Sequence, residues 1–145
     1  MLSFGATKNG GMGAEAVVFF DAKHAVDFKF YRKQGMQLAS KMRYLAAQFT
    51  ALFEDDLWLQ NARHSNRMAQ LLKRELSQLP QIKIAHKVEA NGVFAVVPRR
   101  AIAKILKRYF FYMWNEEQTM VRWMCSWDTK ESDVKQFVEF VRASL

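Results

Sequence analysis

The spacing of hydrophobic positions changes along the chain, and each change predicts a different kind of element. Two short apolar runs, at residues 2–4 and 16–20, predict buried strands with a loop between them. Apolar side chains then recur every three or four residues from 38 to 53 and again from 57 to 79, which predicts two amphipathic helices. Pro80 ends the second helix, because the residue before a proline disfavours helical backbone.

After Pro80 the pattern becomes alternating and rich in β-branched residues. Strands are predicted at residues 82–88, 93–97, 109–114 and 119–127. Asn91-Gly92, between the first two of these strands, is typical of a hairpin turn. Helices are predicted at 99–107 and over the last stretch of the chain. The pattern therefore divides the chain into a part at 1–79 with two strands and long helices, and a compact α/β unit at 80–145.

Glu54-Asp55-Asp56 separates the two predicted long helices with three successive carboxylates. We interpret the triplet as a helix junction, in which Asp55 or Asp56 is the N-cap of the second helix and the negative charges lie at its positive end. A pair of catalytic acids is the alternative interpretation, and the pattern favours the junction.

Length and composition describe a globular protein. The chain has 145 residues, of which 50% are hydrophobic and 14% aromatic, enough to bury a core. No apolar run is long enough to span a bilayer, and the first residues lack the layout of a signal peptide. The one cysteine, Cys125, has no partner for an internal disulfide, so we expect a reducing, cytoplasmic setting and an inert core thiol. His24, His64 and His86 show no metal-ligand spacing, and we expect no metal site.

The excess of positive charge suits three classes of ligand. The formal net charge is +8, which is typical of proteins that bind nucleic acid, an anionic membrane or a phosphorylated ligand. One basic group lies at residues 29–43, and a second, at 99–108, has the spacing of a solvated helix face. Trp114, Trp123 and Trp127 lie in predicted strands, where we expect them to pack a core rather than contact a ligand. Nucleic acid is therefore a disfavoured partner, and we expect no membrane association.

Lys8 lies in the predicted loop between the first two strands, with glycines around it. A phosphate-binding P-loop places its lysine after the glycines, whereas Lys8 precedes the glycine pair. A dinucleotide fingerprint at residues 11–16 would open a helix, but a strand is predicted there. The remaining functional interpretation is that Lys8 forms a Schiff base with a cofactor. In that case the turn would desolvate the amine and favour its neutral, nucleophilic form. The hydroxyls of Ser3 and Thr7 would then donate to a phosphate. On composition alone, however, an ordinary lysine in a surface turn is the favoured interpretation.

The segment around Lys8 is similar to a known family. Ser3-Phe4-Gly5-Ala6-Thr7-Lys8-Asn9-Gly10, followed by Gly13-Ala14-Glu15-Ala16-Val17-Val18, resembles the lysine segment of pyridoxal-phosphate-dependent threonine aldolases, in the β-eliminating lyase group of fold type I. The likeness continues at residues 32–35, 40–43, 89–91, 121–124 and 127–129, and so extends over essentially the whole chain. It also corrects the hairpin, because it places Asn91 inside one strand of the small domain, with Gly92 as a local irregularity.

The resemblance implies an α/β fold that corresponds to the C-terminal portion only of a fold type I enzyme. Residues 1–79 would be the C-terminal part of the large, cofactor-binding domain and carry the Schiff-base lysine, and residues 80–145 would form the small C-terminal domain. Members of the family are much longer, so the resemblance implies a C-terminal fragment without a glycine-rich phosphate loop, a ring-stacking side chain or a ring-pairing aspartate. We expect a homo-oligomer or a complementary N-terminal half to complete the site.

The activity that the resemblance implies is cleavage of β-hydroxy amino acids to glycine and an aldehyde, with pyridoxal 5'-phosphate as cofactor. Lys8 corresponds to the catalytic lysine that binds this cofactor, and Arg122 to the arginine that clamps the substrate carboxylate. Lys33 and Arg43 correspond to basic residues that reach the cofactor phosphate or the substrate from a neighbouring subunit. The competing hypothesis is a non-catalytic remnant, or a basic module that binds a partner chain or nucleic acid.

Overall fold

The computed structural model describes residues 1–145 and contains two compact units, residues 1–60 and residues 61–145. The division falls within α3 (Leu57–Leu76), whose buried hydrophobic side chains all belong to the core of the second unit. The domain boundary predicted at residues 79 and 80 therefore lies about one helix later than the boundary set by packing. The two boundaries rest on different criteria, namely packing contacts in the structure and resemblance to a protein family. The domain assignment of 1–79 and 80–145 therefore stays a prediction.

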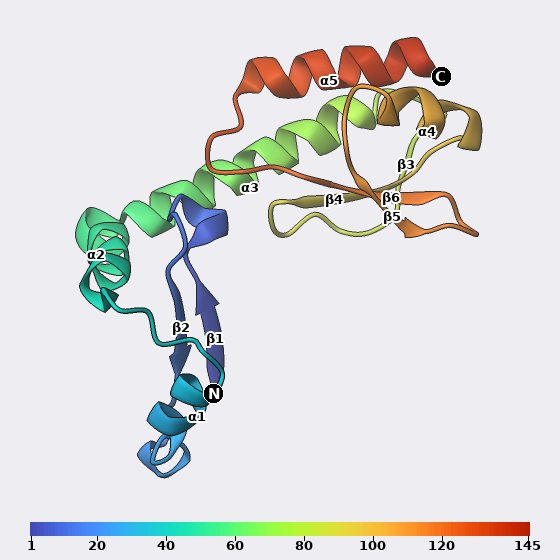
Figure 1. The fold of residues 1–145 in the computed structure, drawn as a ribbon. Coiled ribbons are helices and arrows are strands. Elements are labelled where there is room, and N and C mark those ends of the chain that lie inside the picture. Colours follow the sequence, from blue (N-terminus) through green and yellow to red (C-terminus); the bar gives the residue numbers. More distant parts are fainter. The chain divides into compact units, whose positions relative to one another are not determined.

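The first unit consists of a two-stranded antiparallel sheet and short helices (Figure 1). β1 (Leu2–Gly5) pairs with β2 (Glu15–Val18), with Leu2 opposite Val18 and Gly5 opposite Glu15. The predicted loop between these strands contains a 3-10 turn, η1 (Thr7–Asn9). The other elements of the unit are η2 (Ala22–His24), α1 (Phe28–Gln34), α2 (Met42–Phe53) and η3 (Glu54–Asp56). The pattern predicts the two strands and α2, which begins four residues later than expected, but not α1.

The core of the first unit is small. Its buried hydrophobic residues are Ala6, Ala14 and Leu52, with Phe49 and Trp58 packed against them. The strands predicted to be buried are mostly exposed, so that expectation is wrong for this chain. The physical reason is the number of layers: a two-stranded sheet with one small cluster of aromatic rings beside it has no second layer to cover both faces.

The junction of α2 and α3 has an unusual backbone. Asp55 and Asp56 both adopt positive φ angles, 49° and 56°, in the left-handed region that few residues other than glycine occupy. Neither carboxylate caps α3, so the predicted N-cap is wrong. Instead the side chain of Gln60 donates a hydrogen bond of 2.8 Å to the carbonyl of Asp55 and closes the turn.

The second unit is a four-stranded antiparallel sheet with helices on one face. The strands are β3 (Lys83–Ile84), β4 (Gly92–Val96), β5 (Tyr112–Asn115) and β6 (Met120–Met124), in the order β3-β4-β6-β5. Figure 1 shows α3, α4 (Arg99–Leu106) and α5 (Glu131–Ser144) on the same side of this sheet. Each strand and helix predicted after Pro80 is present at least in part. No helix of the protein is both long and apolar enough to cross a bilayer.

The segment before β4 differs from both readings of Asn91-Gly92. The strand predicted over 82–88 is formed only at Lys83–Ile84, so the two residues do not make a hairpin turn between strands. Asn91 lies just before β4, where its carbonyl accepts a hydrogen bond from the amide of Cys125 and its side chain donates one to the Cys125 carbonyl, both 2.8 Å. The side chain thus replaces a ladder hydrogen bond at the end of the strand.

Strand alternation gives the sheet two different faces. Val93, Ala95 and Val121 are fully buried beneath the helices, as is most of Trp123. The residue between Val121 and Trp123 is Arg122, which is only half-buried and lies on the opposite face. The sheet therefore presents a side without helices on which Arg122 is the central cation.

Candidate functional site

The loop that carries Lys8 is closed by backbone hydrogen bonds. The amide of Ala6 donates to the Ala14 carbonyl at 2.8 Å, and the amides of Asn9 and Gly11 both donate to the Ala6 carbonyl at 2.9 Å. Ala6 is 1% exposed and fills the space that a side chain at Gly11 would occupy, since an added Cβ would lie 2.7 Å from that of Ala6. The loop therefore holds the backbone of Lys8 in one conformation without covering its side chain.

The side chain of Lys8 is exposed and makes no hydrogen bond or ion pair with the rest of the chain. The expected desolvation of this amine by its own turn is therefore wrong. The neighbouring residues Thr7 and Asn9 have short side chains and Gly10 has none. They therefore leave the amine of Lys8 in contact with water. What the turn does supply is a primary amine on a fixed backbone with no competing partner.

The two hydroxyls predicted to reach a phosphate have different surroundings. Ser3 lies on β1 and is exposed. Thr7 donates a long hydrogen bond of 3.5 Å to the carboxylate of Glu15. This carboxylate also occupies the space above Gly5, where an added Cβ would lie 2.4 Å from a carboxylate oxygen. A negative charge beside Thr7 opposes binding of an anion to that hydroxyl, whereas no carboxylate contacts Ser3.

Lys33 and Arg43 are exposed on the two helices of the first unit. Lys33 lies in the last turn of α1, and Arg43 in the first turn of α2. The Arg43 guanidinium lies over the ring of Tyr44, with its central carbon 4.8 Å from the ring centroid. No contact joins either cation to the loop of Lys8, so the first unit alone does not bring these predicted site residues together.

Arg122 has the most developed surroundings of the predicted site residues. Phe94 on β4 and Tyr112 on β5 lie directly opposite it in the sheet. The central carbon of its guanidinium is 5.7 Å from the ring centroid of Tyr112 and 5.2 Å from that of Trp114. Its Nε is buried and has no hydrogen-bond partner, and no carboxylate of the chain pairs with it. Cation–π contacts thus place a planar cation without a counter-ion over two rings.

This arrangement suits a carboxylate ligand. An arginine fork binds a carboxylate in a planar, bidentate manner, and stacking on rings lowers the entropy lost when it does so. Phe94 also belongs to this group of side chains, because its ring centroid is 5.0 Å from that of Trp114. We call Arg122, Phe94, Tyr112 and Trp114 the arginine cluster.

Phe94, Tyr112 and Trp114 are the residues of this cluster that the sequence reasoning missed. Trp114 was expected to pack a core, yet it is 54% exposed, and Trp127 is 42% exposed; only Trp123 is in the core, at 5%. The sequence signal that could have identified Tyr112 and Trp114 is the alternation of side chains between the two faces of a strand. Residues two apart on one strand share a face, so Tyr112 and Trp114 belong together and opposite Arg122.

Two other expectations concern ionisable side chains. Cys125 is buried, which confirms the expected place in the core, and burial raises the pKa of its thiol from 9.0 to about 11; its low reactivity stays a prediction. No group of three or more His, Cys, Asp and Glu side chains could hold a metal ion. His64 has a structural contact instead, 2.6 Å between its Nε2 and the carbonyl of Thr129.

Comparison with known proteins identifies similar chains. No protein-family profile matches. A low specificity L-threonine aldolase of Pseudomonas sp. (strain NCIMB 10558) is 41% identical over 145 residues, which is 100% of this chain and 42% of that protein. Another, from Pseudomonas aeruginosa, is 42% identical over 143 residues, 98% of this chain and 41% of that protein. The solved structure of a Leishmania major threonine aldolase superimposes with a TM-score of 0.87 at 29% identity, covering 99% of this chain and 43% of that one.

These findings confirm the resemblance to threonine aldolases and the α/β fold. The chain spans about 42% of the length of the curated relative from Pseudomonas sp., and the matched portion is the C-terminal part. The similarity extends over both units, since nearly the whole chain is matched in sequence and in structure.

Proposed function

We propose that this chain is the lysine-bearing C-terminal part of a pyridoxal-phosphate-dependent carbon–carbon lyase, which cleaves β-hydroxy amino acids of the threonine type to glycine and an aldehyde. The similarity to threonine aldolases supports the reaction class. The observation that carries the proposal is the amine of Lys8, which projects without a partner from a hydrogen-bonded loop. The expected setting of this reaction is the cytoplasm.

The residues around Lys8 fit the cofactor in two respects. A primary amine without an ion pair is free to condense with an aldehyde, and the exposed hydroxyl of Ser3 lies five residues away on β1 as a donor for a phosphate. When bound, pyridoxal phosphate would supply an electron sink for the cleavage of the Cα–Cβ bond. Lys8 would anchor the cofactor and exchange places with the substrate amine.

Arg122 would hold the substrate carboxylate. Its guanidinium lies over the rings of Tyr112 and Trp114 and has no counter-ion, so a substrate meets no internal competitor. A bidentate pair at this position would fix the orientation of the substrate relative to the sheet. Lys33 and Arg43 are proposed to contact the cofactor phosphate or the substrate of a neighbouring subunit, which agrees with their exposure.

Water must be excluded from Lys8 for efficient chemistry, and the chain itself does not exclude it. We therefore propose that a second surface covers the loop, supplied by another subunit or by a complementary N-terminal half. The exposed apolar side chains of the first unit, among them Phe20 at 78% and Tyr31 at 66%, give such a surface hydrophobic area to bury.

Covalent trapping tests the assignment of Lys8. The protein is incubated with pyridoxal phosphate, reduced with borohydride, and the labelled peptide is mapped by mass spectrometry. We expect the label on Lys8, loss of that label in Lys8→Arg, and unchanged labelling in the matched control Lys107→Arg, an exposed lysine on the second unit. Label spread over other lysines with Lys8 unmodified would refute a cofactor site and favour a non-catalytic remnant.

A further inference from the structure

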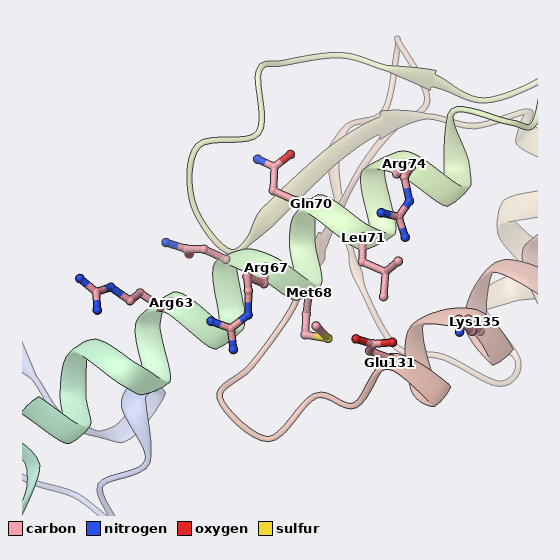
Figure 2. Close-up of a pocket in the computed structure, with 9 residues that line it drawn as sticks. Arg63, Arg67, Met68, Gln70, Leu71, Arg74, Glu131 and Lys135 are labelled. Carbon is pink, nitrogen blue, oxygen red and sulfur yellow. The ribbon is translucent and has the colours of Figure 1, made fainter.

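A second cationic surface lies in the second unit, on the helices rather than on the sheet. A groove of about 690 Å³ runs along α3 and the start of α5 (Figure 2). Four cationic side chains and one carboxylate line it, a net charge of +3: Arg63, Arg67, Arg74, Lys135 and Glu131. We call these five residues the basic groove. None of them takes part in the function proposed above.

Most of the positive charge in the basic groove is uncompensated. Arg63, Arg67 and Lys135 make no ion pair and no hydrogen bond with the chain. Arg74 pairs with its neighbour Glu75 at 3.3 Å. Figure 2 shows the side chains of Arg67 and Arg74 extending from α3 on the side where α5 begins. Like charges on one helix face repel each other, and an anionic ligand would remove that cost.

The spacing of the cations indicates the shape of the ligand. Arg63 and Arg67 are four residues apart on α3, so their side chains emerge about 6 Å apart along the helix. Carboxylates four residues apart on a second helix have the same spacing. We propose that the basic groove binds an acidic polypeptide segment, whose carboxylates, one helical turn apart, pair with Arg63 and Arg67.

The lining favours a polypeptide over a nucleic acid. No aromatic side chain lines the groove, so nucleic acid bases would find no ring on which to stack. Glu131 lowers the positive charge of the groove and leaves a carboxylate that could accept hydrogen bonds from the backbone amides of a peptide. Asn66 and Gln70 add side-chain amide groups that match a peptide backbone; the Gln70 amide already donates to the carbonyl of Val88, which fixes its orientation.

Binding of a synthetic acidic peptide tests the proposal. The probe is a fluorescein-labelled peptide of glutamate and alanine, with glutamates four residues apart and about 15 residues long, the length at which such a helix begins to form. Fluorescence anisotropy at low salt should show saturable binding, which weakens as salt is raised. The double variant Arg63→Glu/Arg67→Glu should weaken binding about tenfold or more, because two attractive pairs become repulsive.

The matched control is the double variant Arg100→Glu/Lys107→Glu. It changes the net charge by the same amount at exposed positions of α4 and the loop after it, neither of which makes a side-chain contact. We expect a change of less than about twofold in affinity, and circular dichroism shows whether each variant is folded. Equal weakening by both pairs would mean a response to overall charge and would overturn the proposal. Absence of binding at low salt, or tighter groove-dependent binding of oligothymidine than of the peptide, would overturn it as well.

Discussion

The two units of the chain differ in how completely they bury their hydrophobic residues. The core of the second unit contains 21 buried residues contributed by all of its layers, whereas that of the first unit contains three. Both units have amphipathic helices and apolar strands. The difference lies in the number of layers: the second unit has a sheet with helices on it, and the first has only a two-stranded sheet and short helices.

The comparison shows what hydrophobic periodicity reports. It reports that a side chain is suited to burial, but not which surface buries it. Val17 and Val18 on β2 fit a strand of a larger sheet, yet both are exposed by more than a third in this chain. Val93 and Val121 have the same residue type and strand setting, and both are 0% exposed, because helices lie over them.

Truncating one leucine in each unit should give the largest contrast. Leu76→Ala removes a side chain that is 0% exposed in the large core, and we expect the free energy of unfolding to fall by about 3–5 kcal/mol. Leu52→Ala removes one that is 6% exposed in the small cluster, and we expect a loss of less than about 1.5 kcal/mol, since the few atoms around it can close the gap. Urea unfolding followed by circular dichroism measures both. Equal losses would show that the first unit is as well packed as the second.

Thiol reactivity gives a second, smaller contrast. Cys125 is 3% exposed with its pKa raised by burial to about 11, so in the folded protein at pH 8 its alkylation should be about 100-fold slower than in urea. In Leu52→Cys the new thiol lies at a position that is 6% exposed, and we expect it to react much faster, through opening of the first unit. Mass spectrometry of the two alkylated peptides from one sample compares them directly. Similar rates at both cysteines would contradict the difference between the units.

The same raised pKa gives a pH dependence with a definite sign. Between pH 9 and about 11 the thiol of Cys125 is ionised in the unfolded chain and protonated in the folded one. The folded state therefore binds more protons, and the free energy of unfolding falls as pH rises through that interval. Below pH 9 both states hold the proton, and Cys125 leaves the stability unchanged.

Substitution of an exposed aromatic in the first unit should have the smallest effect on stability. Phe20 is 78% exposed, so Phe20→Ser should change the free energy of unfolding by less than about 0.5 kcal/mol. It should nevertheless reduce self-association in light scattering, because it removes apolar area from a surface that we expect a second body to cover. A loss of stability comparable to that of Leu76→Ala would mean that Phe20 is buried in solution.

The secondary structure was largely predictable because most elements have strong local signals. Helical spacing located α3 and α4, and runs of β-rich residues located β4, β5 and β6. The α2–α3 junction was not predictable in detail, because successive positive φ angles at Asp55 and Asp56 depend on how two helices are joined rather than on residue preference. The exposure of β1 and β2 was missed for the reason given above, since their pattern does not say what covers them.

The sequence predicted which residues belong to the candidate site, but not which side chains surround them. The resemblance singled out Lys8 and Arg122, and the roles of Ser3, Thr7, Lys33 and Arg43 stay predictions. Shelter for Lys8 was expected from its glycines, but glycine provides space and no cover. The rings of Tyr112 and Trp114 come from β5, and alternation places both on one face of that strand, but the pairing of β5 with β6 that brings them to Arg122 joins distant parts of the chain and is not revealed by a local pattern.

The place of Arg122 on the open side of the sheet has a consequence for how the gene can vary. Insertion or deletion of a single codon within β6 would rotate every following side chain to the opposite side, sending the guanidinium beneath the helices and the indole of Trp123 into water. The same mutation would thus remove both the exposed cation of the arginine cluster and the packing of Trp123 in the core. Among functional descendants of this sequence, length changes should therefore accumulate in the connecting segments, such as residues 85–91, and be absent from these five positions.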